Sequence, residues 1–404
     1  MITRRSWMAG AVAGATALAA PPLSAHPSRA SARRVVGDVE VFRLPVNHRG
    51  DWLLVRLSAG GGLTGLGDAS HGGNDALTHR YLKQFAALLR GRSIFDIEWF
   101  RRAVATTIAD ERRASAIVAA SALEQCLWDL AGRALDVPTH DLFGGRVRDT
   151  IPLYANINRS TDPRTPDGFA RKASLAIDAG FNAVKLAPFD AIPADPARRG
   201  DVRELTEQGI ACATAVRQAI GPNRHLLIDA HSRFDRVQGI ELAARLQPHA
   251  LYWLEEVTPA APIDDLVAIN RVATMPTAGG EAVRGIKAFY DYIRAGAVDI
   301  VMPDVKICGG MLELKKIAGI AEAAGLDVSP HGPASPVGNS AAAHVAATLP
   351  NFTILEYAFG EVPWRSDLLI GGEPVEAGRL KFSAEPGLGI RLNDRFLAMR
   401  AERL

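Results

Sequence analysis

The chain has 404 residues, of which 48% are hydrophobic and 6% aromatic, and its formal net charge at pH 7 is +2. This length allows two or three domains and a large hydrophobic core. Nearly balanced charge gives no reason to expect a nucleic acid as a partner. With 37 glycines, 24 prolines and few aromatic residues, the composition favours an α/β enzyme with many short loops over an all-β sandwich.

Residues 1–32 predict an export signal rather than a folded element. Arg4-Arg5 precede an uncharged stretch, rich in alanine and glycine, from Met8 to Ala20, and small residues follow at Ala30-Ser31-Ala32. This order is typical of a signal peptide, and the paired arginines favour twin-arginine export over the general secretory route. The apolar run is too short for a membrane anchor. We therefore expect a periplasmic protein that has no membrane contact after signal removal.

Three cysteines, Cys126, Cys212 and Cys308, are spread widely through the rest of the chain. An odd number of cysteines at such spacing does not predict a disulfide framework. An exported protein without disulfides fits a route that carries already folded proteins.

Residues 33–145 predict a smaller α+β domain. Val36–Leu44 and Trp52–Leu57 have the composition of strands and are joined by a polar turn, and Gly60-Gly61-Gly62 makes the next turn. Helical periodicity follows and places a set of apolar residues on one face, namely Leu123, Leu127, Leu130 and Ala131. Gly144-Gly145 end this region.

From residue 146 to about residue 360, short apolar runs alternate with longer helical stretches. The eight runs are Ile151–Ile157, Ala183–Leu186, Leu226–Ile228, Leu251–Leu254, Thr277–Ala278, Val298–Met302, Leu326–Ser329 and Thr353–Leu355. Apolar strands that alternate with helices predict parallel strands covered on both faces, and eight of them predict a (β/α)₈ barrel. The alternative is a doubly wound open sheet, which the lack of G-x-G-x-x-G after the first strand disfavours. We expect the turn-rich residues 361–404 to pack back on the smaller domain and complete it as a cap.

Three acids stand at the ends of consecutive predicted strands. Asp229, Glu255 and Glu281 follow strands three, four and five at equal intervals along the chain. Because the carboxyl ends of barrel strands face one active site, these carboxylates should converge. Ligands that are all oxygen select a hard cation, of which Mg²⁺ is the natural choice. The alternative is that each acid caps a helix or is a solvated loop residue.

Asp304 and His331 stand at the ends of the next two strands. A carboxylate that accepts a hydrogen bond from an imidazole orients the ring and raises its basicity, so His331 is the candidate general base. His231 lies two residues beyond Asp229 and should face the same pocket, unless it is a fourth metal ligand or a loop residue.

Two further strand-end residues have open roles. Glu356 ends strand eight and would accept a hydrogen bond, act as an electrophilic group or form a plain salt bridge. Lys185 ends strand two and would either hold a substrate carboxylate or neutralise the acid cluster. A divalent cation beside a base supports removal of a proton α to a carboxylate, because it stabilises the charge that develops there.

At these residues the sequence resembles the enolase superfamily, in its mandelate racemase-like subgroup. Three further segments look like that family: Leu127–Gly132, with Val137-Pro138; Leu142–Gly145; and Pro386–Gly389. The resemblance implies that Asp229, Glu255 and Glu281 are the metal ligands, that Asp304 and His331 form the Asp–His dyad and that Glu356 is the strand-eight acid. It also implies a symmetric homo-oligomer.

One departure from the family bears on the reaction. Many members carry Lys-x-Lys on strand two, but here Lys185 is followed by Ala187, which cannot move a proton. Simple racemisation is therefore disfavoured. Asp229 to Arg233 instead looks like the Asp-x-His-x-Arg of galactonate- and mannonate-type dehydratases, which implies that His231 protonates the leaving hydroxyl and that the product is a 2-keto-3-deoxy acid.

Substrate contacts are expected from strand ends and from the smaller domain. The candidates are Arg233, Asn156, Asn158, His48 and Trp52, with loops at Asn47–Trp52 and His71-Gly72-Gly73. A surface salt bridge is the alternative for Arg233, and turn capping is the alternative for the asparagines. The leading hypothesis is a sugar-acid dehydratase. An epimerase or cycloisomerase that uses the same chemistry, and an exported sugar-acid-binding protein without turnover, are kept as alternatives.

Overall fold

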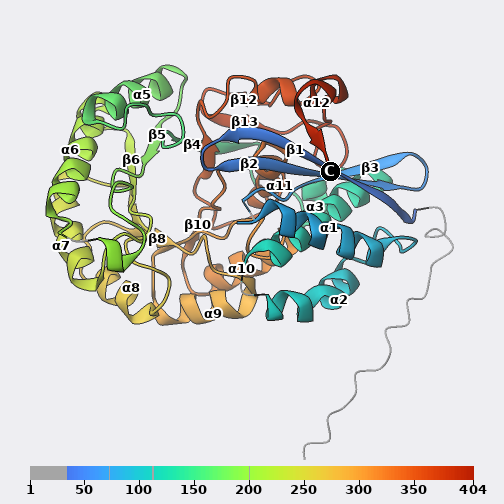
Figure 1. Cartoon of the computed structure of the whole chain (residues 1–404), viewed down its shortest axis with the longest axis horizontal. Helices are drawn as coiled ribbons and strands as arrows, with labels where there is room; N and C mark the ends of the chain where they lie inside the picture. Colours follow the sequence, from blue (N-terminus) through green and yellow to red (C-terminus); the bar gives the residue numbers. More distant parts are fainter. Residues whose placement is uncertain (1–33, 72, 112, 200) are drawn as a thin grey trace, which may run out of the picture.

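The computed structural model describes residues 34–404 except 72, 112 and 200. The predicted signal peptide with Arg4-Arg5 lies outside the described residues, and so does Gly72 of the predicted loop at 71–73. Within the described part, an antiparallel sheet with three helices stands beside a ring of parallel strands that helices surround (Figure 1). Each helix in these ranges is too short or too polar to cross a lipid bilayer.

The smaller domain is built on an antiparallel meander of β1 (Val36–Asn47), β2 (Gly50–Ala59) and β3 (Leu63–Asp68). The first two strands are longer than the sequence predicted, so the turn between them is only His48-Arg49. The strand β3 has no counterpart among the predicted strands. At the other edge, β14 (Glu402–Arg403) pairs with β1, so the last residues of the chain extend this sheet.

Three helices cover this sheet: α1 (Asp75–Leu89), α2 (Ile97–Asp110) and α3 (Ser115–Leu135). They bury one apolar core with the strands, which includes Val55, Phe85 and Leu123. The predicted apolar face lies within α3. That helix is buried on nearly every side, because it also meets the barrel, where Glu124 accepts hydrogen bonds from the main-chain N–H groups of Met311 and Leu312.

Glycines in β3 let α3 approach the strand at main-chain contact distance. A Cβ added to Gly67 would lie 2.1 Å from the carbonyl oxygen of Ala122, so that the strand or the helix would have to shift. We expect Gly67→Ala to overpack this contact, with a loss of about 2–3 kcal/mol and a fall in Tm of roughly 4–8 °C. The control is Gly319→Ala on the exposed face of α10 (Met311–Ala323), where nothing lies within 4 Å and Tm should hold or rise. An unchanged Tm of the Gly67 variant in a thermal melt would contradict this packing.

The larger domain contains the eight parallel strands that the sequence predicts. They are β4 (Thr150–Asn156), β5 (Ala183–Leu186), β6 (His225–Asp229), β7 (Trp253–Glu255), β8 (Thr277–Gly279), β9 (Ile300–Val301), β10 (Asp327–Val328) and β11 (Leu355–Ala358). From β4 to β10 each strand pairs with the next in chain order, and β11 pairs with β4. A parallel bridge between Val328 and Phe352 joins β10 to the segment before β11. The order has no reversal, which excludes the doubly wound alternative.

Seven helices follow the first seven strands and form the outer layer (Figure 1). They are α5 (Pro166–Asp178), α6 (Arg203–Ile220), α7 (Arg236–Leu246), α8 (Ile263–Asn270), α9 (Gly285–Ala295), α10 and α11 (Pro336–Ala346). Short elements complete the connections: α4 (Thr139–Leu142), η2 (Pro196–Arg198) and η3 (Gln247–His249). As predicted, the last strand has no such helix and is followed by η4 (Arg365–Leu368). The (β/α)₈ fold with its α+β cap is therefore confirmed.

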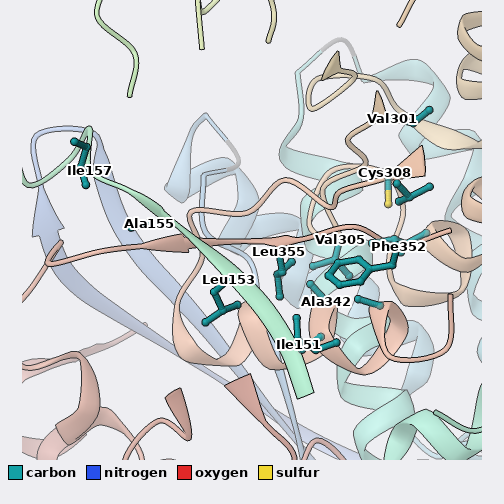
Figure 2. Packing of buried hydrophobic residues seen from close by; sticks show 14 of the residues in the cluster. Ile151, Leu153, Ala155, Ile157, Val301, Val305, Cys308, Ala342, Phe352 and Leu355 are labelled. Carbon is teal, nitrogen blue, oxygen red and sulfur yellow. The ribbon is translucent and has the colours of Figure 1, made fainter. Parts of the chain in front are cut away.

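Alternation along the barrel strands separates two cores. Outward side chains pack against the helices, and Figure 2 shows Ile151 and Leu153 of β4 near Leu355 and Phe352. Inward side chains form a separate apolar layer, made of Tyr154, Ala183, Leu227, Trp253, Ala278, Ile300, Met302 and Ile354. Two residues further along several strands the inward positions are polar, at Asn156, Lys185, Asp229, Glu255 and Glu356. An apolar floor thus lies beneath a polar mouth.

The eighth strand differs from its prediction. It runs from Leu355 to Ala358 instead of ending at Leu355, so Glu356 lies within the strand. Because β11 starts opposite Leu153, the first residues of β4 are left without a partner, and β13 (Arg379–Lys381) pairs with them. The C-terminal segment, with β12 (Val375–Glu376) and α12 (Asp394–Arg400), therefore contacts the barrel as well as the smaller domain. The three cysteines are free and buried.

A buried pair of histidines joins α4 to α11 and should make stability depend on pH. The Nδ1 atoms of His140 and His344 lie 3.1 Å apart, and burial together with His140 lowers the pKa of His344 to about 3. The unfolded chain takes up a proton near pH 6.5, whereas the folded chain resists protonation down to about pH 3, so stability is lost as the pH falls through this window. We expect a loss of about 2 kcal/mol between pH 7.5 and 5 in denaturant titrations. In His344→Asn the free energy of unfolding should fall less between these two pH values. An equal fall in both proteins would contradict the assignment of this pH dependence to His344.

Candidate active site

The polar mouth of the barrel opens into a cavity of about 770 Å³. The turn between β1 and β2 in the smaller domain forms part of its wall, through His48 and Arg49. The barrel contributes strand-end side chains to the same wall, among them Asn156, Lys185, Asp229, Glu281, Asp304 and His331. A volume of this size is typical of a small-molecule site.

The three predicted acids lie together at the barrel end of this cavity, above the apolar layer. Oxygen atoms of Asp229, Glu255 and Glu281 all lie within 4.8 Å of one another. Asp229 and Glu255 are the last residues of β6 and β7, and both are buried. Glu281 follows Gly280, whose φ of +110° suits a glycine and turns the chain as β8 ends. The structure thus brings together the acids that the sequence placed at consecutive strand ends.

Lys185 lies fully buried among these acids. Its Nζ is 2.7 Å from Oε1 of Glu255, 3.1 Å from Oε1 of Glu356 and 3.5 Å from Oδ2 of Asp229. Burial lowers the pKa of Lys185, but the surrounding carboxylates outweigh it and raise the pKa well above its ordinary value. This geometry favours the neutralising role of Lys185 over the substrate-binding one. Burial, followed by the charge of Asp229, still raises the pKa of Glu255 to about 8, so one ammonium group does not balance the cluster.

Glu356 is ionised and its oxygens have partners within the barrel. Oε1 accepts a hydrogen bond from Nδ2 of Asn156 at 2.6 Å, and Oε2 accepts one from the N–H of Gly332 at 2.9 Å. Burial raises the pKa of Glu356, but Lys185 and His331 outweigh it and bring the pKa to about 2. A carboxylate in this state accepts hydrogen bonds and forms ion pairs; it does not donate a proton at neutral pH.

Asp304 and His331 form the predicted dyad. Nδ1 of His331 lies 2.8 Å from Oδ2 of Asp304, and Nε2 faces the acid triad, 3.1 Å from Oε2 of Glu281. Lys306, which the sequence did not single out, donates from Nζ to the same Asp304 oxygen at 2.9 Å. Burial raises the pKa of Asp304, but Lys306 and His331 outweigh it and hold the pKa well below its usual range. Burial lowers the pKa of His331, but Glu281, Glu356 and Asp304 outweigh it and raise the pKa to about 9.

His231 forms a second pair of imidazole and carboxylate on the other side of the triad. Its Nε2 lies 3.1 Å from Oδ2 of Asp229, and its Nδ1 contacts Asp190 in the loop after β5. Its backbone has a φ of +46°, and its main-chain N–H donates a hydrogen bond of 2.9 Å to Oδ1 of Asp229. Two imidazoles therefore face one acid triad from two sides, and a carboxylate orients each.

The smaller domain and the C-terminal segment close the cavity by polar contacts. Arg49 forms an ion pair with Asp190, which joins the β1–β2 turn to the barrel. Glu361 accepts hydrogen bonds at Oε1 from Nδ2 of Asn47 at 3.1 Å and from Nη1 of Arg159 at 2.8 Å. His71 lines the cavity with Nε2 3.1 Å from the same Arg159 atom. The two predicted loops therefore lie at the cavity, as far as their residues are described.

The predicted substrate residues divide into two groups. His48, Asn156, Asn158 and Arg233 line the cavity, and Nδ2 of Asn158 is buried without a hydrogen-bond partner among the described residues. Trp52 does not line it, and this prediction is wrong. Trp52 is fully buried in the main core, where its ring meets that of Trp364 at 5.3 Å between centroids. Successive side chains of β2 point to opposite faces of the sheet, and this alternation places Trp52 on the face that packs into the core.

Sequence reasoning missed several charged residues of the site, among them Asp190, Lys306, Arg159 and Arg164. Asp190 and Arg159 lie in loops that follow β5 and β4, where no periodicity marks the direction of a side chain. Lys306 lies two residues beyond Asp304, the same interval that identified His231 after Asp229. That interval is the one signal that would have found it.

Comparison with known families agrees with this architecture. Residues 42–144 match the mandelate racemase / muconate lactonizing enzyme N-terminal domain, and residues 168–396 match the enolase C-terminal domain-like family. The chain belongs to the enolase superfamily. The two matches correspond to the cap and to most of the barrel of this superfamily member.

Curated relatives and solved structures cover most of this enolase-superfamily chain. A D-xylonate dehydratase of Haloferax volcanii is 30% identical over 366 residues, which are 89% of this chain and 87% of the relative. A D-gluconate/D-galactonate dehydratase of Picrophilus torridus is 29% identical over 374 residues, 90% of this chain and 93% of the relative. The crystal structure of a mandelate racemase/muconate lactonizing enzyme-like protein from Rubrobacter xylanophilus has a TM-score of 0.85 and 31% identity, and the match covers 92% and 98% of the two chains.

Proposed function

We propose that this chain is a Mg²⁺-dependent sugar-acid dehydratase, which removes the proton α to a carboxylate and expels water from the β position. The observation that carries the proposal is the pair of imidazoles, His331 and His231, that face one acid triad from two sides. One base and one acid at such positions suit a β-elimination, in which a proton leaves one carbon and a hydroxyl leaves the next. The dehydratase names of the two curated relatives support the same class of reaction.

The residues of the triad fit Mg²⁺. Three carboxylates supply oxygen donors only, and burial together with the neighbouring carboxylates raises the pKa of Glu255 despite the ammonium group of Lys185. Asp229, Glu255 and Glu281 would hold the ion. When bound, the ion would supply positive charge next to the substrate carboxylate as a second negative charge develops there. Its charge at Glu281 would also bring the pKa of His331 back toward the neutral range.

His331 is the base in this proposal. Its Nε2 faces the triad, where the substrate carboxylate would lie, and takes the α-proton. Asp304 accepts the hydrogen bond from Nδ1 and fixes both the tautomer and the ring orientation, while Lys306 keeps Asp304 ionised. The ring can then receive a proton at Nε2 without turning.

His231 is the acid in this proposal. Asp190 orients its ring at Nδ1, and Nε2 contacts Asp229, a different member of the triad from the Glu281 that His331 contacts. A proton from Nε2 leaves with the β-hydroxyl as water, and the electron pair left at the α-carbon forms the double bond of an enol. The enol then takes up a proton to give the 2-keto-3-deoxy acid. Ala187 leaves strand β5 without the second lysine that a racemase would need.

A substrate screen tests this function. Purified protein with Mg²⁺ is assayed against aldonic, aldaric and uronic acids for 2-keto-3-deoxy acid, with proton NMR in D₂O as a second readout. His231→Asn should lose keto-acid formation at least about 100-fold while α-deuterium exchange continues, because it removes the acid and leaves the base. Deuterium exchange or an isomer without keto acid in the wild type would favour the epimerase or cycloisomerase. Neither signal from any acid would favour the binding protein.

Export and assembly are part of the proposal. The supporting feature is the Arg4-Arg5 pattern with its small-residue site at Ala30-Ser31-Ala32. A periplasmic fraction should contain a chain that begins near residue 33, and replacement of both arginines with lysine should block its export. A chain that still begins at Met1 would refute this part. Light scattering of the mature protein should show a homo-oligomer.

A further inference from the structure

Three guanidinium groups surround one carboxylate at a second charged site in the cavity. Asp190 forms ion pairs with Arg49, with Arg164 at 2.9 Å and, at the longer distance of 3.8 Å, with Arg233. All four side chains line the cavity. Because one carboxylate offsets one guanidinium, two positive charges remain in excess. We call these four residues the arginine cluster.

The arginines of the cluster differ in how many partners they have. Arg164 is anchored, with hydrogen bonds of 2.7 Å to the carbonyl oxygens of Asn158 and Ala187. Arg233 is not anchored in this way. Its Nε is buried without a hydrogen-bond partner among the described residues, and its one ion-pair contact is the long one to Asp190. Arg233 and the half-buried Arg49 therefore retain donors for a ligand in the cavity.

The excess of positive charge is confined to this cluster. In the described part of the wall, Arg159 is paired with Glu361 and Asp304 with Lys306, so these pairs are neutral. At the triad the excess is negative and suits a metal cation. The cavity thus has a negative end and a positive end. A ligand whose distal end is neutral would leave this positive end without a counter-charge, although Arg233 and Asp190 are largely buried there, with exposed fractions of 17% and 11%.

The His231 ring separates the two ends. Its Nε2 contacts Asp229 of the triad and its Nδ1 contacts Asp190 of the cluster, so the cluster lies one imidazole ring beyond the triad. The proposed reaction places the reacting carboxylate at the triad, the α-proton before His331 and the leaving hydroxyl before His231. Carbon atoms beyond the leaving hydroxyl then extend past His231 toward the cluster.

We propose that the substrate carries a second anionic group at the end distal to the reacting carboxylate, where Arg49 and Arg233 bind it. The second group is either the other carboxylate of an aldaric acid or the phosphate of a phosphorylated aldonic acid, both of which guanidinium groups bind through paired hydrogen bonds. The inference rests on the proposed function, because that function places the first carboxylate at the triad.

The test compares substrates that differ only at the distal end. The Mg²⁺-loaded enzyme is assayed with glucarate against gluconate, galactarate against galactonate, and 6-phosphogluconate against gluconate. We expect kcat/KM to be at least 100-fold higher for the doubly charged acid, either in the two aldaric pairs or in the phosphate pair. The kind of pair that shows this difference identifies the distal group as a carboxylate or a phosphate. Arg49→Gln and, independently, Arg233→Gln should lower this ratio at least tenfold. Arg203→Gln, whose side chain is 88% exposed and paired with Asp201, should leave the ratio unchanged.

Equal or better use of the neutral-ended acids, or an equal loss for both members of a pair in the arginine variants, would overturn the inference. Binding to Mg²⁺-loaded His331→Asn by calorimetry separates this inference from the proposed reaction. If no acid is turned over by the wild type but doubly charged acids bind the variant at least tenfold more tightly, the reaction fails and the distal anion site stands. If both kinds of acid bind equally, the distal anion site fails.

Discussion

His331→Asn is expected to lower kcat by roughly 10³-fold and to abolish α-deuterium exchange. Asparagine can still donate a hydrogen bond to Asp304, which His331 contacts at 2.8 Å, so the barrel should keep its fold. It has no group that takes a proton at the position of Nε2. Steady-state assays for keto acid and proton NMR in D₂O, on whichever acid the substrate screen identifies, measure the two effects.

The matched control for this variant is His225→Asn. His225 begins the strand β6 that ends with Asp229, so it lies at the opposite end of the barrel, and its side chain is exposed. The control should retain wild-type kcat and exchange. If His331→Asn still exchanged the α-proton at the wild-type rate, another group would be the base, and the dyad would have to be structural.

Lys185→Met is expected to destabilise the protein by about 3–5 kcal/mol and to remove activity. The substitution keeps much of the side-chain volume but removes the ammonium group that contacts Asp229, Glu255 and Glu356, and leaves these buried carboxylates to repel one another. A thermal melt in chelator should show a fall in Tm of roughly 6–15 °C. Because Mg²⁺ would relieve the same repulsion, it should raise the Tm of the variant more than that of the wild type.

A control for the loss of a lysine charge is Lys287→Met. That side chain is 88% exposed and pairs with Asp291 on the surface of α9, so its loss should change stability by less than about 1 kcal/mol. A Tm of Lys185→Met equal to that of the wild type in chelator would mean that the acid cluster is not held by this lysine. If Mg²⁺ raised the Tm of neither protein, that result would argue against a cation at the triad.

Family and reaction class could be read largely from the sequence, for a reason that lies in barrel geometry. In a (β/α)₈ barrel the order of strands in space is their order in the chain, so Asp229, Glu255 and Glu281 at consecutive strand ends had to converge. The same rule placed Asp304 beside His331. The position of a residue at the end of an apolar run therefore predicts, from the sequence alone, that its side chain lies at the active-site end of the barrel.

The sequence determined this framework, and the tertiary structure decided what loops and register contribute. Pairing with β4 set the limits of β11, which moved Glu356 into the strand, and the pleat of β2 sent Trp52 into the core. Asp190 and Arg49 are 141 positions apart in the chain and meet only because the cap docks on the barrel. Contacts of this kind depend on how two domains pack, and no local pattern of residues encodes that. The triad could thus be predicted from the sequence, whereas the arginine cluster could be recognised only in the tertiary structure.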